Sequence, residues 1–295
     1  MATHKIDFYK ARDFGQTVSV TFEFLRNNLK SLGKPLLLIS GPFFILSGIF
    51  TGLSRQTIFS AGMVPFSPAQ FSLTLIISLI FLLAGMILLT TIVYNYILLY
   101  LDDEDKIFEI ETIWSKSKRY ILKIIGFSIG LFLILFLFII PFIVTLASGN
   151  VFISLLVFFL LMIPIVYISN SASLIFIIGI AENKGFIESL KRSFKLIDNR
   201  WWITFGLVIV FSLIQGFISF IFQLPESIMS LVLVMSTIDG GQSGFIPELL
   251  NIIFSVFSTF SYLLYSITIT GLTFHYYSLI EQKEAKTLLQ RIENL

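Results

Sequence analysis

The chain contains no cysteine and little charge. Without cysteine it can have no disulfide, no thiolate metal ligand and no cysteine nucleophile. Charged residues make up 13% of its 295 residues and hydrophobic residues 56%, whereas a soluble domain is roughly 25% charged. A soluble domain of this length could not keep so much apolar surface out of water. The composition therefore predicts an integral membrane protein.

Residues suited to acid–base or metal chemistry are also scarce. The chain has two histidines, and His275, near the end of the last apolar segment, has no second histidine with which to share a metal. No Walker, dinucleotide-binding or metalloprotease motif occurs. We therefore expect no catalytic residue, no cofactor and no metal. The net charge of +2 is too small to favour nucleic acid as a partner.

Windows without charge predict six membrane-spanning helices, because a charge at the bilayer centre costs roughly 2.5–3.5 kcal/mol on insertion scales. Residues 124–181 are long enough for two spans, and the Ser148-Gly149-Asn150 turn signal divides them. Residues 1–34 lack the apolar core of a cleaved leader, so we expect the first span to be retained. The predicted spans are about residues 35–53, 71–101, 124–147, 151–181, 201–225 and 249–280. Together they predict one all-α membrane domain over residues 1–295.

Lysine and arginine predict the orientation of these spans. Of the 20 lysines and arginines, 19 fall in segments on the same side as the N-terminus, and Arg55 falls on the other side. Segments on the cytoplasmic side of a membrane carry such an excess. We therefore expect both tails, residues 1–34 and 281–295, in the cytoplasm.

Each cytoplasmic segment contains a stretch with helical periodicity. The apolar positions are Val18, Phe22, Leu25, Leu29 and Leu32 in the first, Ile107, Ile110, Trp114 and Ile121 in the second, and Phe186, Ile187, Leu190, Phe194 and Ile197 in the third. Basic amphipathic helices of this kind lie in the membrane surface, where each cation attracts anionic lipid by ~1 kcal/mol. The candidate lipid contacts are Lys30, Lys118, Arg119, Lys191, Arg192 and Lys195. The alternative is that these helices only pack against the spans as structural elbows.

The order of surface helix, outgoing span and returning span occurs three times. This indicates a weak repeat of about 90 residues and a pseudo-threefold arrangement of helical hairpins. One further apolar segment, residues 227–237, follows Pro225-Glu226. It is expected either to lie on the outer surface or to re-enter the membrane.

The returning spans become polar toward their cytoplasmic ends. Asn95, Asn170, His275 and Tyr276 are candidates to line a polar cavity open to the cytoplasm, which a transporter or lipid-handling protein would need. The alternative for the amides is hydrogen bonding between neighbouring helices. Active transport favours ionisable groups or broken helices near the midplane, and this chain has no charge there.

Residues 181–206 carry a recognisable pattern. Glu182 and Gly185 precede the run Leu190-Lys191-Arg192-Ser193-Phe194, and Trp201-Trp202 enter the fifth span. This pattern resembles the central signature of a broad group of uncharacterised bacterial six-span proteins. That group includes the membrane domain attached to some glycerophosphodiester phosphodiesterases. The resemblance implies a six-span fold in a bacterial inner membrane.

Two N-terminal segments, residues 10–15 and 21–28, resemble a Bacteroidota-type branch of the same group. The resemblance transfers no activity, because no segment of the chain is large enough for the soluble catalytic domain of the phosphodiesterases. Two functions remain. The first is a non-enzymatic scaffold or partner subunit at the cytoplasmic face, whose partners are the bilayer, anionic lipids and other membrane proteins. The alternative is a transporter or lipid-handling protein with a cytoplasm-facing polar cavity.

Overall fold

The computed structural model describes residues 6–60, 73–102, 109–238 and 244–284, and every regular element in these ranges is a helix. Six helical segments in them are long and apolar enough to cross a membrane, which confirms the predicted number of spans. They are Leu29–Arg55, Leu73–Asp102, Ile110–Ala147, Val151–Ala181, Trp201–Ser236 and Phe245–Glu284. The start of the predicted second span and most of the predicted C-terminal tail lie outside the described residues. By helix length and hydropathy the chain is a multi-pass membrane protein.

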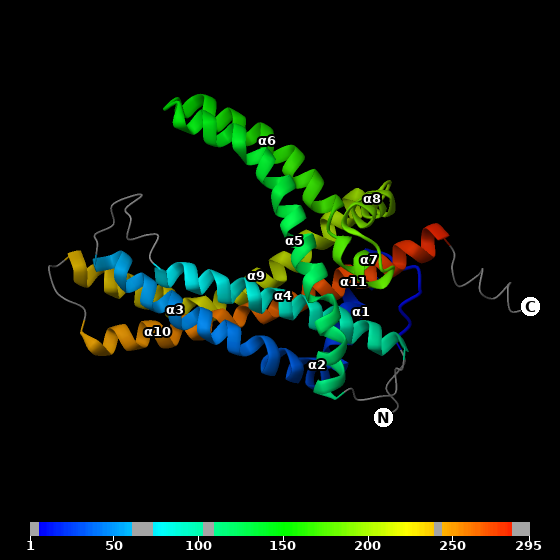
Figure 1. Cartoon of the computed structure of the whole chain (residues 1–295), viewed down its shortest axis with the longest axis horizontal. Coiled ribbons are helices and arrows are strands. Elements are labelled where there is room, and N and C mark those ends of the chain that lie inside the picture. Colours follow the sequence, from blue (N-terminus) through cyan, green and yellow to red (C-terminus); the bar gives the residue numbers. More distant parts are fainter. Residues whose placement is uncertain (1–5, 61–72, 103–108, 239–243, 285–295) are drawn as a thin grey trace, which may run out of the picture.

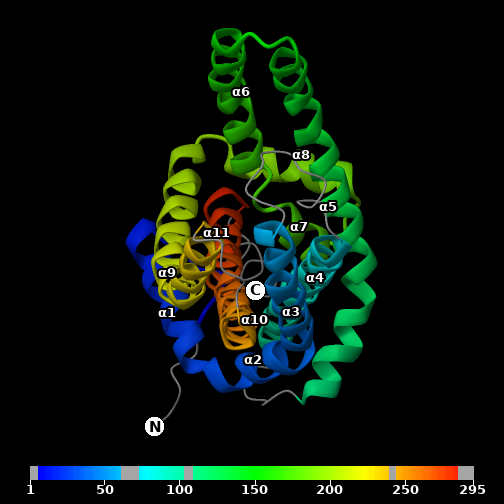
Figure 2. The same ribbon diagram turned by 90° about the vertical axis from the view of Figure 1, so that its left-hand side faces the viewer.

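Five long helices form the main bundle (Figures 1 and 2). They are α3 (Gly41–Ser60), α4 (Leu73–Asp102), α9 (Trp201–Ile238), α10 (Phe245–Thr259) and α11 (Tyr265–Glu284). Helices α3, α4 and α9 run beside α10 and α11, and the last two follow one another end to end. Two short elements, α2 (Leu29–Pro35) and the π-helical η1 (Leu36–Ser40), lead into α3. The 3-10 turn η3 (Phe260–Leu264) joins α10 to α11, so these three make one span.

Helices α3 and α10 pack with their backbones close together. A Cβ atom added at Gly48 would lie 2.5 Å from the Cα of Val256, and one at Gly52 would lie 2.8 Å from the Cα of Ile252. Gly48 and Gly52 are four residues apart and therefore lie on the same face of α3. This small-residue pattern lets the two backbones approach, and such packing drives helix association in lipid.

The hairpin of α5 (Ile110–Ala147) and α6 (Val151–Ser171) diverges from the main bundle (Figures 1 and 2). Its two apolar windows are 0% and 6% buried, against 39% for the windows of α3 and α4. The three predicted hairpins therefore do not pack alike, and the pseudo-threefold arrangement stays a prediction. The divergence ends near the short helix α7 (Ile175–Ala181), where the chain returns to the bundle.

Two of the three predicted surface helices are separate elements, α1 (Phe14–Asn27) and α8 (Phe186–Ile197). The middle one is not, because Ile110–Ile121 is the beginning of the 38-residue helix α5. No breaker lies between residues 110 and 125, so propagation of the helix is favourable there. Ile107 lies outside the described residues.

The segment 227–237 also differs from its expected structure. It is the end of the continuous helix α9, which runs through Pro225 to Ile238, so it is neither a separate surface helix nor a re-entrant one. Proline is tolerated inside membrane helices because neighbouring groups satisfy the freed backbone carbonyl. Glu226 therefore lies inside a helix and not in a loop.

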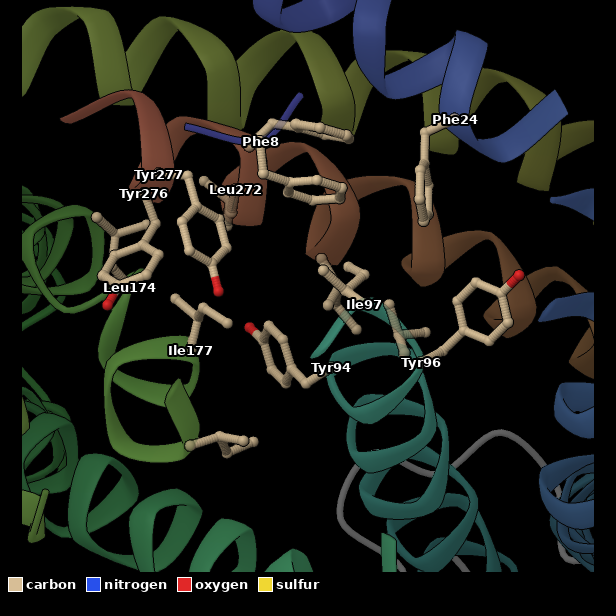
Figure 3. Packing of buried hydrophobic residues seen from close by; sticks show 14 of the residues in the cluster. Phe8, Phe24, Tyr94, Tyr96, Ile97, Leu174, Ile177, Leu272, Tyr276 and Tyr277 are labelled. Atoms are coloured by element: carbon tan, nitrogen blue, oxygen red, sulfur yellow. The ribbon is translucent and has the colours of Figure 1, made fainter. Parts of the chain in front are cut away.

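The buried core is concentrated where residues 6–13, α1, α4, α7 and α11 meet (Figure 3). The rings of Phe8 and Phe274 stack with centroids 4.3 Å apart, and Phe24 meets each of them edge-on at 5.6 Å. Such aromatic pairs contribute about 0.5–1.5 kcal/mol beyond their buried area. We call this end of the bundle, with α1, α8 and the last turns of α4 and α11, the basic end. The opposite end, with Arg55 and the start of α10, is the far end.

Candidate functional site

Helix α1 packs against α11 with a different face from the one that its apolar periodicity indicated. Its buried residues are Thr17, Val20, Thr21 and Phe24. Phe22 remains exposed, and Leu29, which begins α2, is 69% exposed. The predicted apolar face is therefore partly free to contact lipid, while threonines and one aromatic ring fill the contact with the bundle.

Five of the six predicted lipid-contacting cations are exposed and lie on elements at the basic end (Figure 1). They are Lys30, Lys118, Arg119, Lys191 and Lys195. The ammonium nitrogen of Lys118 lies 5.1 Å from the ring centroid of Trp114. Large apolar side chains are exposed beside these cations, including Ile187 on α8 and Trp202 at the start of α9.

The sixth cation, Arg192, is held inside an ion-pair cluster that joins α7, α8 and α11. Its Nε lies 3.2 Å from Oε1 of Glu182, and its other end pairs with Glu284. Glu182 also pairs with Lys184 and accepts a hydrogen bond of 2.9 Å from the hydroxyl of Tyr276. We call these five residues the Glu182 cluster. Arg192 is thus less available to lipid than the other five cations.

The charges of the Glu182 cluster stabilise one another. Burial by itself raises the pKa of the Glu182 carboxyl, but hydrogen bonds from Lys184 and Tyr276 and the charge of Arg192 outweigh it and lower that pKa. Burial likewise opposes the charge of Arg192, and its contacts with Glu284 and Glu182 leave its pKa raised. Both groups therefore stay ionised and paired, and the pair holds α7, α8 and α11 in fixed relative positions.

The four residues expected to line a cytoplasmic cavity are all buried, and each has its own partner. Asn95 Nδ2 donates to the Thr91 carbonyl within α4 at 2.9 Å, and Asn170 Nδ2 donates to the Trp201 carbonyl at 3.2 Å. His275 Nε2 lies 2.8 Å from Thr204 Oγ1 of α9, whereas its neighbour Tyr276 contacts Glu182. The contact of Asn170 is the interhelical bond expected of a membrane amide. The cavity itself stays a prediction.

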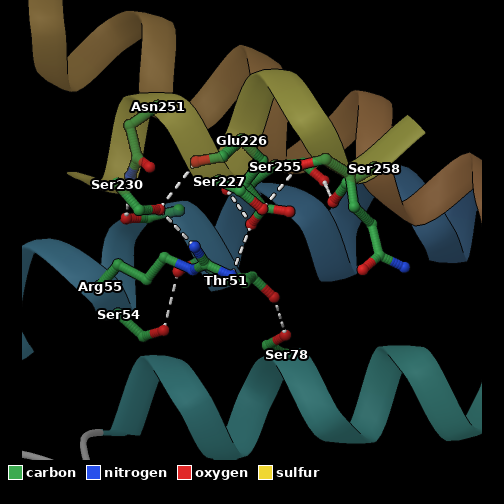
Figure 4. A network of polar contacts seen from close by, with 12 residues as sticks. Thr51, Ser54, Arg55, Ser78, Glu226, Ser227, Ser230, Asn251, Ser255 and Ser258 are labelled. Carbon is green, nitrogen blue, oxygen red and sulfur yellow. Dashed lines mark hydrogen bonds and ion pairs between the residues drawn. The ribbon is translucent and has the colours of Figure 1, made fainter. Parts of the chain in front are cut away.

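A second polar network, at the far end, was not foreseen from the sequence (Figure 4). Arg55 of α3 lies 2.8 Å from Oε1 of Glu226 on α9, and Glu226 is 5% exposed. The same carboxylate oxygen accepts from Ser255 Oγ of α10 at 2.9 Å, and Asn251 Nδ2 donates to the Gly52 carbonyl at 3.1 Å. The charge distribution predicts that Arg55 lies on the outer side, but nothing in the sequence pairs it with Glu226. One signal in the sequence could have indicated this network: Glu226 lies within an otherwise apolar run, where an unpaired charge would be costly.

This far-end network joins α3, α9 and α10 and offers little for chemistry. Removing one partner of a buried ion pair leaves the other charge uncompensated, so such pairs fix the relative position of their helices. Among the described residues, no group of three or more His, Asp or Glu side chains is placed to hold a metal. No family model, no curated protein and no solved structure matches the chain.

Proposed function

We propose that the chain is a non-enzymatic component of a bacterial inner membrane that binds anionic lipid at the cytoplasmic face and organises membrane partners there. The observation that carries this proposal is the sharing of one end of the molecule by exposed cations and exposed apolar side chains. Such surfaces favour the boundary between acyl chains and anionic headgroups.

Helices α1 and α8 support the proposal in the same way. Phe22 of α1 and Ile187 of α8 are exposed apolar side chains, and Lys30, Lys191 and Lys195 are exposed nearby on the same or the next element. An amphipathic helix at the surface sinks its apolar face about 5–10 Å into the headgroup boundary. The lysines would then lie at headgroup depth, where each contributes ~1 kcal/mol with anionic lipid.

The proposed orientation rests on the distribution of lysine and arginine. With both termini in the cytoplasm, 19 of 20 basic residues fall on that side. The kinship with the six-span bacterial group also belongs to the proposal. Its support is that Glu182, Gly185 and Arg192 of the signature have structural tasks, at the Glu182 cluster and at the N-cap of α8.

The absence of catalysis is proposed because the buried or half-buried ionisable side chains Glu182, Glu226 and His275 already have partners within the protein. Glu182 is held by three partners and Glu226 by Arg55 and Ser255. The His275 side chain is hydrogen-bonded to that of Thr204. A general acid or base must reach a substrate proton directly or through one water. Side chains that are buried or half-buried and paired in this way are poorly suited to that task.

The test is the lipid retained by the purified protein. The variant Lys118→Gln/Arg119→Gln/Lys191→Gln/Lys195→Gln should lose most of the phosphatidylglycerol that native mass spectrometry detects on the wild-type protein. Retention by the wild type should also fall with salt, because exposed charges are screened. The matched control is Lys116→Gln, since Lys116 is exposed but already lies 4.0 Å from the carboxylate of Asp102. Equal retention of phosphatidylglycerol by all three proteins would refute the proposal.

A further inference from the structure

We propose that a groove on α9, away from the basic end, binds an uncharged amphiphile whose polar head carries hydroxyl or ester groups. The groove lies between α9 and the η3–α11 part of the last span and has a volume of about 310 Å³. Ser212, Gln215, Ser219 and Gln223 line one side, and Tyr265 and Thr268 line the other. The four α9 residues are spaced by three, four and four positions, so they form one polar face of the helix.

This polar face lies at membrane depth. Trp201 lies at the basic end of the bundle and Glu226 in the far-end network, and the 25 residue steps from one to the other along α9 correspond to about 38 Å at about 1.5 Å per residue. Ser212 to Ser219 therefore lie near the middle of the bilayer. Ser212 and Gln223 are exposed, and Gln215 and Ser219 are half-buried. Polar groups left facing hydrocarbon are costly, so such a face favours a polar occupant.

Only part of this polar face is used within the protein. Thr268 Oγ1 donates to the side-chain oxygen of Gln215 at 3.0 Å, which leaves the amide nitrogen of Gln215 available to a ligand. The hydroxyls of Ser212 and Ser219 can each donate and accept. The groove therefore offers both donors and acceptors to a head that contains hydroxyl and carbonyl oxygens.

The polar groove continues onto an open apolar surface of α9, which shares Ser212 and Gly216 with it. Leu213, Phe217 and Phe220 belong to this apolar surface, all of whose residues lie on α9. At Gly216, where the groove meets the apolar surface, a Cβ atom would meet no other atom within 4 Å. A polar groove beside an apolar surface fits a molecule with a small head and a hydrocarbon tail.

The absence of charged residues from the lining favours an uncharged head group. None of the lining residues is an acid, a lysine, an arginine or a histidine. The nearest charged residue along α9, Glu226, is already held by Arg55 and Ser255. A phosphate would be buried without a cation, which is unfavourable. A diacylglycerol-like head with hydroxyl and ester oxygens meets no such cost, and this ligand goes beyond the anionic lipids proposed for the basic end.

The experiment uses a diacylglycerol with a photoactivatable diazirine in one acyl chain, mixed with the full chain in phosphatidylcholine nanodiscs. Peptide mass spectrometry should place the crosslinks on α9. Gly216→Leu fills the junction of the polar groove with the apolar surface and should reduce these crosslinks by about tenfold. Gly126→Leu is the matched control, because Gly126 of α5 is also exposed with open space around its Cβ position. Gln215→Leu, which removes polar groups without filling the junction, should also reduce them, and both variants must keep the wild-type elution profile.

Competition separates the possible occupants. Unlabelled diacylglycerol should displace the probe, and the same concentration of phosphatidylglycerol should not. Equal displacement by both lipids, or crosslinking that is equal in Gly216→Leu and Gly126→Leu, would overturn the proposal. Since the chain has no cysteine, the variant Ser219→Cys can test whether a second copy of the chain occupies the groove. Efficient formation of a disulfide-linked dimer by this variant would assign the groove to another copy of the chain and also overturn the proposal.

Discussion

Glu182 and Glu226 lie at opposite ends of the bundle, and each is paired with an arginine; Glu226 is buried and Glu182 is half-buried. Glu182 pairs with Arg192 at the basic end and Glu226 with Arg55 at the far end. Desolvation of two charges can exceed their attraction, so these pairs need not add stability compared with apolar residues. These pairs fix the relative positions of their helices, because a displaced helix would leave one charge of the pair without its partner.

The Glu182 cluster should make stability depend on pH. Because the pKa of Glu182 is lowered in the folded protein from 4.5, the unfolded chain binds its proton more readily. The stabilisation is therefore present above about pH 4.5 and is lost as the pH falls further. Glu182→Gln should cost about 1.5 kcal/mol at neutral pH, the lower end of the range for a hydrogen bond to a charged group, because Glu182 is half-buried.

Thermal unfolding in detergent, followed from neutral pH to about pH 3, measures this effect. The melting temperature of the wild type should fall further over that range than that of Glu182→Gln, because the variant has no carboxyl at position 182 to protonate. Glu188→Gln is the control, since Glu188 is exposed and caps α8 without joining the cluster. A wild type and a Glu182→Gln variant with the same pH dependence would contradict the assignment.

At the scale of helices, α3 and α10 show how the bundle is held together in lipid. Gly48 and Gly52 let the backbone of α3 approach Val256 and Ile252. The close approach also allows Thr259 Oγ1 of α10 to donate to the Phe44 carbonyl of α3 at 2.9 Å. Packing and interhelical hydrogen bonds therefore act together where apolar burial gives no advantage over lipid.

Gly48→Ala should weaken this contact. Its new Cβ would lie 2.5 Å from the Cα of Val256, and forced overpacking costs typically about 1–3 kcal/mol. Gly41→Ala is the control on the same helix, because a Cβ at Gly41 meets nothing within 4 Å. Unfolding in increasing concentrations of denaturing detergent should show a lower midpoint for Gly48→Ala alone. Equal midpoints for the two variants would show that this contact does not hold the bundle.

The local pattern of the sequence was enough to find the spans and the two separate surface helices. Charges are costly in hydrocarbon, so their absence marks the spans, and Lys191 and Lys195 mark the solvent side of α8. The pattern could not show that residues 110–121 continue into α5, because periodicity does not indicate where a helix ends without a cap or breaker. It also could not pair Arg55 with Glu226, which are 171 positions apart and meet only through tertiary packing.

The divergence of α5 and α6 could not be predicted for a related reason. Exposed residues such as Leu137 and Phe159 are apolar, and so are the buried residues of α4 such as Leu89 and Ile92. Lipid and protein interior are equally apolar surroundings, so hydropathy does not distinguish a lipid-facing helix from a packed one. The polar groove of α9 was partly visible, since the spacing of Gln215, Ser219 and Gln223 can be read directly from the sequence.

On the scale of the whole molecule, the two ends of the bundle differ in character. The basic end holds the large aromatic core, the Glu182 cluster and the exposed cations, whereas the far end holds the small network around Glu226. The proposed lipid surface at the basic end and the proposed amphiphile groove on α9 are separated along the bundle. The first depends on six crossings with the basic end in the cytoplasm, whereas the second depends only on α9 crossing the membrane.

Labelling of single cysteines in intact cells measures this orientation directly, and the cysteine-free chain gives no background. Ser148→Cys lies at the exposed tip of the α5–α6 hairpin, and Lys195→Cys lies on the exposed face of α8. A membrane-impermeant maleimide should label Ser148→Cys in cells whose inner membrane is intact, and Lys195→Cys only after that membrane is permeabilised. Labelling of Lys195→Cys in intact cells, with Ser148→Cys protected until permeabilisation, would contradict the proposed orientation and the function that depends on it.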